Sequence, residues 1–195
     1  MQDWLKKITE KQIIQTPSIS VRREVYETIG AFDTRLSWCE DWEMWARIAS
    51  QYKIGYVNEI LAEYRIHTSS NSSRYIVSGE NLKDLQRGVE IISKYVNYMP
   101  TCKYIKEALD KWALYGLNMS VNIIDNREGS INQLKEALKM AQKEDTYLRA
   151  AVVFDKIKHW HKIGTFSLLK MINPWMLVPI PFLRQIILQP YKTKS

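Results

Sequence analysis

The chain has 195 residues, of which 46% are hydrophobic and 11% are aromatic. This composition excludes a disordered protein and supplies enough apolar side chains for a substantial core. The 28 basic and 21 acidic residues leave a net charge of +7, which favours anionic lipids or pyrophosphate-bearing ligands as partners. No nucleic-acid-binding motif accompanies this charge, so nucleic acid is not expected as a partner.

Two isolated cysteines, Cys39 and Cys102, are too few for a disulfide framework or a zinc site. This cysteine usage fits a reducing compartment, and the first residues do not read as a signal peptide. The sequence therefore predicts a cytoplasmic location.

The first part of the chain predicts short, mixed elements. Residues 3–12 and 38–51 are expected to be helices, and residues 23–29 a helical turn that Gly30 ends. Ile19 and Val21 alternate with polar neighbours, which predicts a short strand, and residues 53–57 predict another. A turn at Asn58 and an extended or helical piece to Arg65 follow. The polar run 68–73 predicts a loop, the best candidate for a mobile flap or a domain seam.

From Gly79 onward the pattern is helical. Helices are predicted over residues 79–97, 100–124, 131–144 and 146–162, with a turn at 125–130. The simplest interpretation is an accessory helical bundle, and the alternative is a module for acceptor recognition or oligomerisation. Three regions follow from this division: residues 1–76, residues 77–165 and an apolar, basic tail at 166–195.

The predicted tryptophan-rich helix carries an aspartate at a position where its pattern would place an apolar residue. At 100° per residue, Trp38, Trp42, Trp45 and Ile48 fall in one arc, and Asp41 lies inside it. A carboxylate among tryptophans costs free energy unless a polar group pairs with it or a ligand uses it. The pattern therefore predicts that Asp41 faces a functional pocket or is a buried, hydrogen-bonded structural aspartate.

Two ordinary local interactions are expected on the same helix. Ser37 and Glu40 have the spacing of a capping box, which would satisfy free amides at the helix start. Glu43 and Arg47 have the spacing of a surface ion pair.

Four stretches around this helix occur in a characteristic order: TPSISVRR at residues 16–23, GAFD at 30–33, EDWEMWARIA at 40–49 and YRIH at 64–67. Together they resemble the acceptor half of family 2 glycosyltransferases, which have the GT-A fold. The resemblance covers roughly residues 10–75. It implies an α/β protein, a partial GT-A fold (its C-terminal half), followed by a mostly α-helical extension, with helices dominating overall.

The resemblance implies an inverting transfer of a sugar from a nucleotide-sugar donor to an acceptor hydroxyl. Asp41, the aspartate of the Glu-Asp motif, is then the expected general base, because such a base must lie within hydrogen-bonding reach of the acceptor hydroxyl. The neighbouring acceptor-binding side chains are expected to be Trp38, Glu40, Trp42 and Trp45. The tryptophans would exclude water and stack on a sugar ring.

The donor side of the family pattern is missing from this sequence. The family's nucleotide-binding half precedes the matched region and carries an Asp-x-Asp motif that holds Mg²⁺ or Mn²⁺, and no Asp-x-Asp occurs here. The expectation is therefore a fragment of a longer transferase, inactive alone, with no tightly bound cofactor. By the same resemblance, His67 is expected as a metal ligand and Arg65 as a diphosphate contact. Both also allow structural roles: a loop histidine bonded to a carbonyl, and an ion pair of Arg65.

The tail at residues 166–191 is rich in apolar side chains and punctuated by basic ones. Its longest uncharged run, residues 171–183, is shorter than the about 20 residues that a spanning helix needs, and Pro174, Pro179 and Pro181 interrupt it. The tail therefore predicts either a membrane-surface contact or packing onto the missing half of the enzyme. Membrane contact, at the inner face, would suit a glycan or lipid-linked acceptor in polysaccharide biosynthesis.

A competing class of function is a non-catalytic remnant of a split transferase that binds a sugar, a partner or a membrane. The two classes differ in whether an Asp-x-Asp half is encoded directly upstream in the same reading frame.

Overall fold

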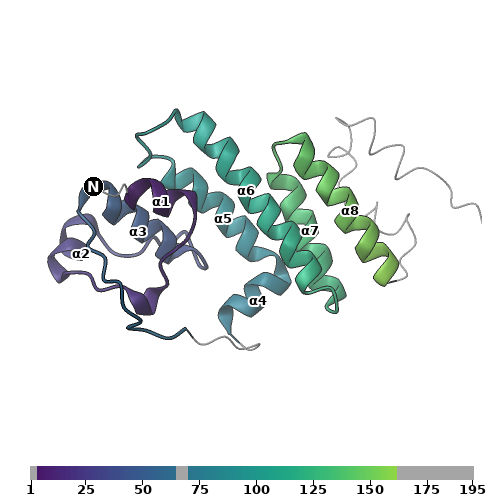
Figure 1. Cartoon of the computed structure of the whole chain (residues 1–195), viewed down its shortest axis with the longest axis horizontal. Coiled ribbons are helices and arrows are strands. Elements are labelled where there is room, and N and C mark those ends of the chain that lie inside the picture. Colours follow the sequence, from purple (N-terminus) through teal and green to yellow (C-terminus); the bar gives the residue numbers. More distant parts are fainter. Residues whose placement is uncertain (1–3, 65–69, 162–195) are drawn as a thin grey trace, which may run out of the picture.

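The computed structural model describes residues 4–64 and 70–161. These residues form eight α-helices and one short 3-10 helix, without a β-strand among them (Figure 1). In chain order the elements are α1 (Trp4–Glu10), η1 (Thr16–Ser18), α2 (Arg23–Ile29), α3 (Glu40–Gln51), α4 (Asn71–Ser78), α5 (Glu80–Ile92), α6 (Thr101–Asn122), α7 (Arg127–Met140) and α8 (Glu144–Trp160).

The predicted α/β fold is wrong for the described residues, which are all-helical. Neither residues 19–21 nor residues 53–57 form a strand. Ile19 does have extended backbone, with φ −122° and ψ 141°, so the local preference for extended chain is present. A strand, however, also needs a neighbour that pairs with its amides and carbonyls, and no described segment supplies one.

Several predicted helices are confirmed, and one was missed. α3 occupies most of the predicted range 38–51, and Gly30 ends α2 with a positive φ of 87°. α4 forms where the sequence predicted a polar loop, because the Ser70 side chain accepts a hydrogen bond from the Ser73 amide and caps the helix start. Gly79, with φ 78°, then separates α4 from α5, so the single helix predicted from residue 79 begins after a sharp bend.

The helices from α4 to α8 pack side by side, and α1, α2 and α3 lie at one end of this row (Figure 1). α3 joins the two groups, because it contacts both α1 and α5. The Trp42 ring and the Trp112 ring on α6 lie roughly perpendicular, with their centroids 5.2 Å apart, and the Tyr104 hydroxyl donates to the Thr9 carbonyl at 3.0 Å. A single cluster of buried apolar side chains runs from Ile8 to Ile157.

Two glycines let helices approach closely. A Cβ at Gly88 on α5 would lie 2.8 Å from the Cys39 sulfur, and one at Gly116 on α6 would lie 2.5 Å from a Leu82 methyl carbon and 3.0 Å from the Ala137 Cβ. Real Cβ atoms do not tolerate contacts this short, so both positions need glycine for packing.

No helix within residues 4–64 and 70–161 combines the length and the apolar character needed to cross a membrane. The tail at 166–191, for which the sequence predicts membrane contact or packing, lies outside the described residues.

Candidate functional site

Asp41 lies in the first turn of α3, where its carboxylate is held by the N-terminal segment of the chain. One carboxylate oxygen accepts hydrogen bonds from Gln12 Nε2 at 2.8 Å and from the Trp42 amide at 2.7 Å. The other accepts from the Thr16 hydroxyl at 3.1 Å. The acid within the tryptophan arc is therefore half-buried and paired with polar side chains.

The surroundings of Asp41 increase its proton affinity. Burial raises the pKa of this carboxyl above the ordinary aspartate value, and the hydrogen bonds from the Trp42 amide and the Thr16 hydroxyl oppose part of the rise. The positive end of the α3 dipole also favours the ionised form. A carboxylate with this balance can take up a proton from a hydroxyl more readily than a fully solvated one.

Two of the tryptophans assigned to acceptor binding lie in the core. Trp42 and Trp45 are 0% and 2% exposed, respectively. Trp42 Nε1 donates to the Ile8 carbonyl at 2.6 Å, and the Trp45 ring meets Phe32 edge-on at 6.0 Å. In this arrangement neither ring offers a face on which a sugar can stack.

Trp38 and Glu40 are half-buried beside the start of α3. Trp38 Nε1 and one carboxylate oxygen of Glu40 are buried without a hydrogen-bond partner among the described residues. Burial raises the pKa of Glu40, and the carboxylates of Asp41 and Asp84 raise it further, while a backbone hydrogen bond opposes the rise. Trp45 Nε1 is buried without a partner as well, so three polar groups of the predicted acceptor site are unused by the described part of the fold.

The predicted capping box of Ser37 and Glu40 is wrong. The residue that precedes α3 is Cys39, and no side chain at that position caps the helix. Instead, one carboxylate oxygen of Asp84 on α5 accepts from the amides of Ser37, Trp38 and Cys39 at 3.0, 2.8 and 3.0 Å. A carboxylate is a stronger acceptor than a serine hydroxyl. A residue distant in sequence thus satisfies the Ser37 amide, which the local motif was expected to serve, together with the next two amides.

Glu43 and Arg47 form an ion pair, as their spacing predicts, but the prediction that it lies on the surface is wrong. Glu43 is 1% exposed, and Arg47 bonds both of its carboxylate oxygens at 2.9 and 3.0 Å. Tyr95 donates to the same carboxylate at 2.7 Å. Arg47 also donates to the carbonyls of Ile29 and Ala31 at 2.5 and 2.8 Å, which fixes the turn after α2. No local pattern in the sequence indicated this buried role, because Tyr95 and the carbonyls of Ile29 and Ala31 are distant in the chain.

Arg65 and His67, the residues assigned to the diphosphate and the metal, lie outside the described residues. Within the described ranges, histidine, cysteine and acidic side chains form no group suited to hold a metal ion.

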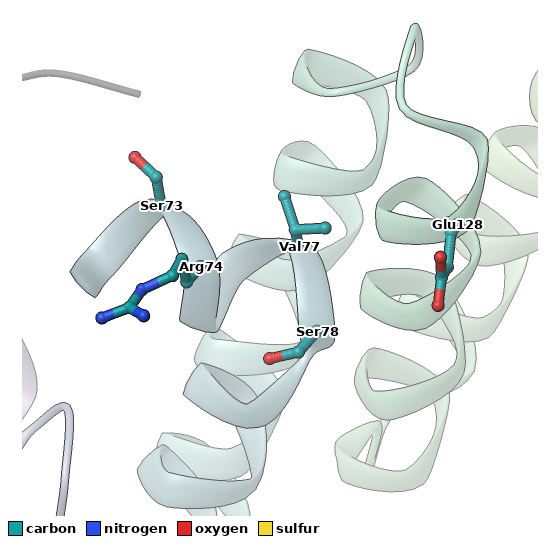
Figure 2. A pocket seen from close by; sticks show the side chains of 5 residues that line it. All are labelled: Ser73, Arg74, Val77, Ser78 and Glu128. Atoms are coloured by element: carbon teal, nitrogen blue, oxygen red, sulfur yellow. The ribbon is translucent and has the colours of Figure 1, made fainter. Parts of the chain in front are cut away.

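A shallow depression of about 310 Å³ lies between α4 and the start of α7. Figure 2 shows the side chains that line it: Ser73, Arg74, Val77, Ser78 and Glu128. None of these residues belongs to the site predicted from the sequence, so the depression and Asp41 are separate features.

Comparison with known proteins gives no assignment for this geometry. A functional interpretation therefore depends on the motifs of the sequence and on the surroundings of Asp41. No protein family, no curated protein and no solved structure matches the chain.

Proposed function

We propose that this chain is the acceptor-side part of a family 2-like glycosyltransferase, with Asp41 as its general base. The reaction would transfer a sugar from a nucleotide-sugar donor to an acceptor hydroxyl with inversion. The observation that carries the proposal is the half-buried Asp41 carboxylate in the first turn of α3, whose raised pKa suits proton uptake.

The hydrogen-bonding geometry of Asp41 leaves room for a substrate. A carboxylate has about four acceptor positions, and those of Asp41 receive one bond each from Gln12, Trp42 and Thr16. The oxygen that accepts only from Thr16 retains the free position. Gln12 and Thr16 then act as positioning residues, which hold that oxygen toward an acceptor hydroxyl.

In this proposal the nucleotide sugar and its Mn²⁺ or Mg²⁺ are held by a separate part of the enzyme, with Arg65 and His67 contributing to the diphosphate and the metal. The acceptor is a glycan or a lipid-linked saccharide. The enzyme works at the inner face of the membrane, which residues 166–191 contact from the cytoplasmic side. Attraction between the net charge of +7 and anionic lipid supports that location.

The test compares the native polypeptide with its Asp41→Asn variant, each isolated from the cells that normally make the protein. Each is supplied with UDP- and GDP-sugars and with glycolipids from the same cells. Release of nucleoside diphosphate should fall by about 10²–10⁴-fold in kcat, the range of a lost general base. The amide can still accept from Gln12 and interact with Thr16, so the melting temperature should change little. An Asp145→Asn variant, at an exposed ion pair with Arg149, is the matched control. Full activity of the Asp41→Asn variant would disprove the assignment.

A non-catalytic role is the second candidate, and two observations favour it. Gln12 and Thr16 already occupy both oxygens of Asp41, and the rings of Trp42 and Trp45 are buried. If Asp41 is only structural, Asp41→Ala should lower the melting temperature while Asp41→Asn leaves every activity of the native polypeptide unchanged. The catalytic role predicts loss of activity in both variants.

A further inference from the structure

The positive charge of the chain is concentrated where α1 meets the connection between α5 and α6 and the first turns of α6. Residues 4–11 and 93–107 contain six lysines and two glutamates, a net charge of +4, compared with +7 for all 195 residues. All six lysine side chains are exposed, and together they form what we term the basic corner: Lys6, Lys7, Lys11, Lys94, Lys103 and Lys106.

Hydrogen bonds hold the segments of the basic corner together. The hydroxyls of Thr9 and Tyr98 share one at 2.7 Å, and the Tyr104 hydroxyl on α6 donates to the Thr9 carbonyl at 3.0 Å. Lys6 Nζ lies 6.0 Å from the centre of the Tyr98 ring. α1 accordingly lies close to the α5–α6 connection (Figure 1), so lysines that are far apart in sequence share one region of the surface.

The fold leaves most of these charges without a counter-charge. Within residues 4–64 and 70–161, four lysines of the corner form no ion pair: Lys11, Lys94, Lys103 and Lys106. Elsewhere on the surface the pattern differs, since Lys83 on α5 pairs with Glu80 at 2.6 Å. Like charges in one region repel one another, and an anionic partner would relieve that repulsion.

The composition of the corner indicates the chemistry of this partner. All of its basic residues are lysines, because residues 4–11 and 93–107 contain no arginine. Arginine recognises phosphates and bases in a fixed bidentate geometry, whereas lysine acts as a point charge. A fluid layer of anionic headgroups offers no fixed geometry, and it strengthens binding by about fivefold for each lysine near it. An all-lysine surface therefore favours a membrane over nucleic acid.

We propose that the basic corner docks onto the surface of a bilayer that contains anionic phospholipid. Lys11 is followed directly by Gln12, which donates to Asp41 at 2.8 Å. Docking through the corner therefore brings the start of α3 toward the headgroups, where a lipid-linked acceptor presents its saccharide. The inference rests on the membrane location proposed above, but it does not require that Asp41 is a general base.

The first experiment measures cosedimentation of the whole chain with phosphatidylcholine vesicles that contain or lack phosphatidylserine. A variant with Lys94→Gln, Lys103→Gln and Lys106→Gln should bind the phosphatidylserine vesicles about 100-fold more weakly at low salt, with a smaller difference at high salt. The matched control carries Lys83→Gln, Lys135→Gln and Lys139→Gln on α5 and α7. It loses the same charge outside the corner, and its binding should change by no more than about fivefold.

Three results would overturn the inference. They are equal binding by the two triple variants, wild-type binding that is absent or independent of phosphatidylserine, and tighter wild-type binding to polyuridylate than to these vesicles at the same salt. If residues 166–191 alone attach the chain, the corner variant binds like the wild type, and only the role of the corner fails. Asp41→Asn should bind vesicles like the wild type, so its transfer activity tests the proposed reaction separately.

The second experiment reads the orientation of the chain on the bilayer. Cys102 is exposed in the first turn of α6, and Cys39 is buried, so a thiol-reactive fluorophore selects Cys102. On phosphatidylserine vesicles its emission should shift to the blue, and quenchers carried by the lipid should reduce it. The control carries Cys102→Ser and Ser78→Cys, which moves the label to the end of α4, and its emission should stay unchanged. A shift at position 78 alone, or at neither position, would show that the corner does not face the membrane.

Discussion

One carboxylate oxygen of Asp84 accepts hydrogen bonds from three consecutive amides, those of Ser37, Trp38 and Cys39. Asp84 is 2% exposed, and its hydrogen bond from the Cys39 amide is buried, so removal of the carboxylate would leave that amide without an acceptor. The position of the first turn of α3, and with it Asp41, therefore depends on a side chain of α5.

We expect Asp84→Ala to lower the free energy of unfolding by about 2–4 kcal/mol, since it removes the acceptor of one buried and two partly buried amides. Urea denaturation of the purified chain measures this value. Asp145→Ala removes an exposed partner of Arg149 and should cost no more than about 0.5 kcal/mol. Equal effects of the two substitutions would contradict the structural role of Asp84.

The raised pKa of Asp41 predicts a pH dependence of stability. The folded state holds this proton more tightly than the unfolded state, so the stabilisation from protonation is complete below the ordinary value of 3.8. It is lost as the pH rises through the higher folded-state pKa. The free energy of unfolding of the wild type, measured relative to Asp41→Asn, should therefore fall as the pH rises through this window. A difference that is constant or grows with pH would show that burial does not raise this pKa.

At the scale of elements, the sequence predicted helices better than strands, and the reason is physical. A helix satisfies its own amides and carbonyls, so the apolar period of residues 38–51 was enough to predict α3. A strand depends on a neighbour elsewhere in the chain, and alternation at residues 19–21 carried no information about one. α4 was missed because serines at the start of a helix resemble a polar loop until the bond from the Ser73 amide to the Ser70 side chain is seen.

The packing of α6 gives a second stability prediction. Gly116→Ala should improve the intrinsic helix propensity by about 1 kcal/mol, but its Cβ would overlap with Leu82 and press on Ala137. Because overpacking of this kind typically costs about 1–3 kcal/mol, which exceeds the gain over most of that range, the melting temperature should fall. Gly55→Ala meets nothing within 4 Å and is the matched control. An increase in stability for Gly116→Ala would show that α5 and α7 can move apart.

At the scale of the whole molecule, the sequence singled out Asp41 as a candidate but did not indicate the residues that hold it. The Glu-Asp motif and the apolar arc placed the acid near the start of a helix, which α3 confirms. Gln12 and Thr16 lie 29 and 25 residues away in sequence, and no local pattern joins them to Asp41. The burial of the Glu43–Arg47 pair was also missed, because Tyr95, which donates to Glu43, and the Ile29 carbonyl, which accepts from Arg47, are tertiary contacts.

The proposal that a separate part of the enzyme holds the nucleotide sugar predicts that this chain alone binds the donor weakly. No Asp-x-Asp motif occurs in the sequence, so little would offset the ordering cost of holding a nucleotide sugar. Calorimetry with UDP- and GDP-sugars and Mn²⁺ should detect no binding tighter than about 1 mM. A micromolar signal that requires the metal would place a complete donor site within residues 1–195.

The hydrogen bonds from the start of α3 to Asp84 also have a consequence for the synthesis of the protein. Asp84 lies 47 residues after Ser37 in the chain, and a ribosome adds about 5–20 residues per second. For about 2–9 s after Ser37 is incorporated, the start of α3 therefore exists without the acceptor that completes it. Synthesis beyond α5, rather than the appearance of the Glu-Asp motif itself, is the event that creates the candidate site.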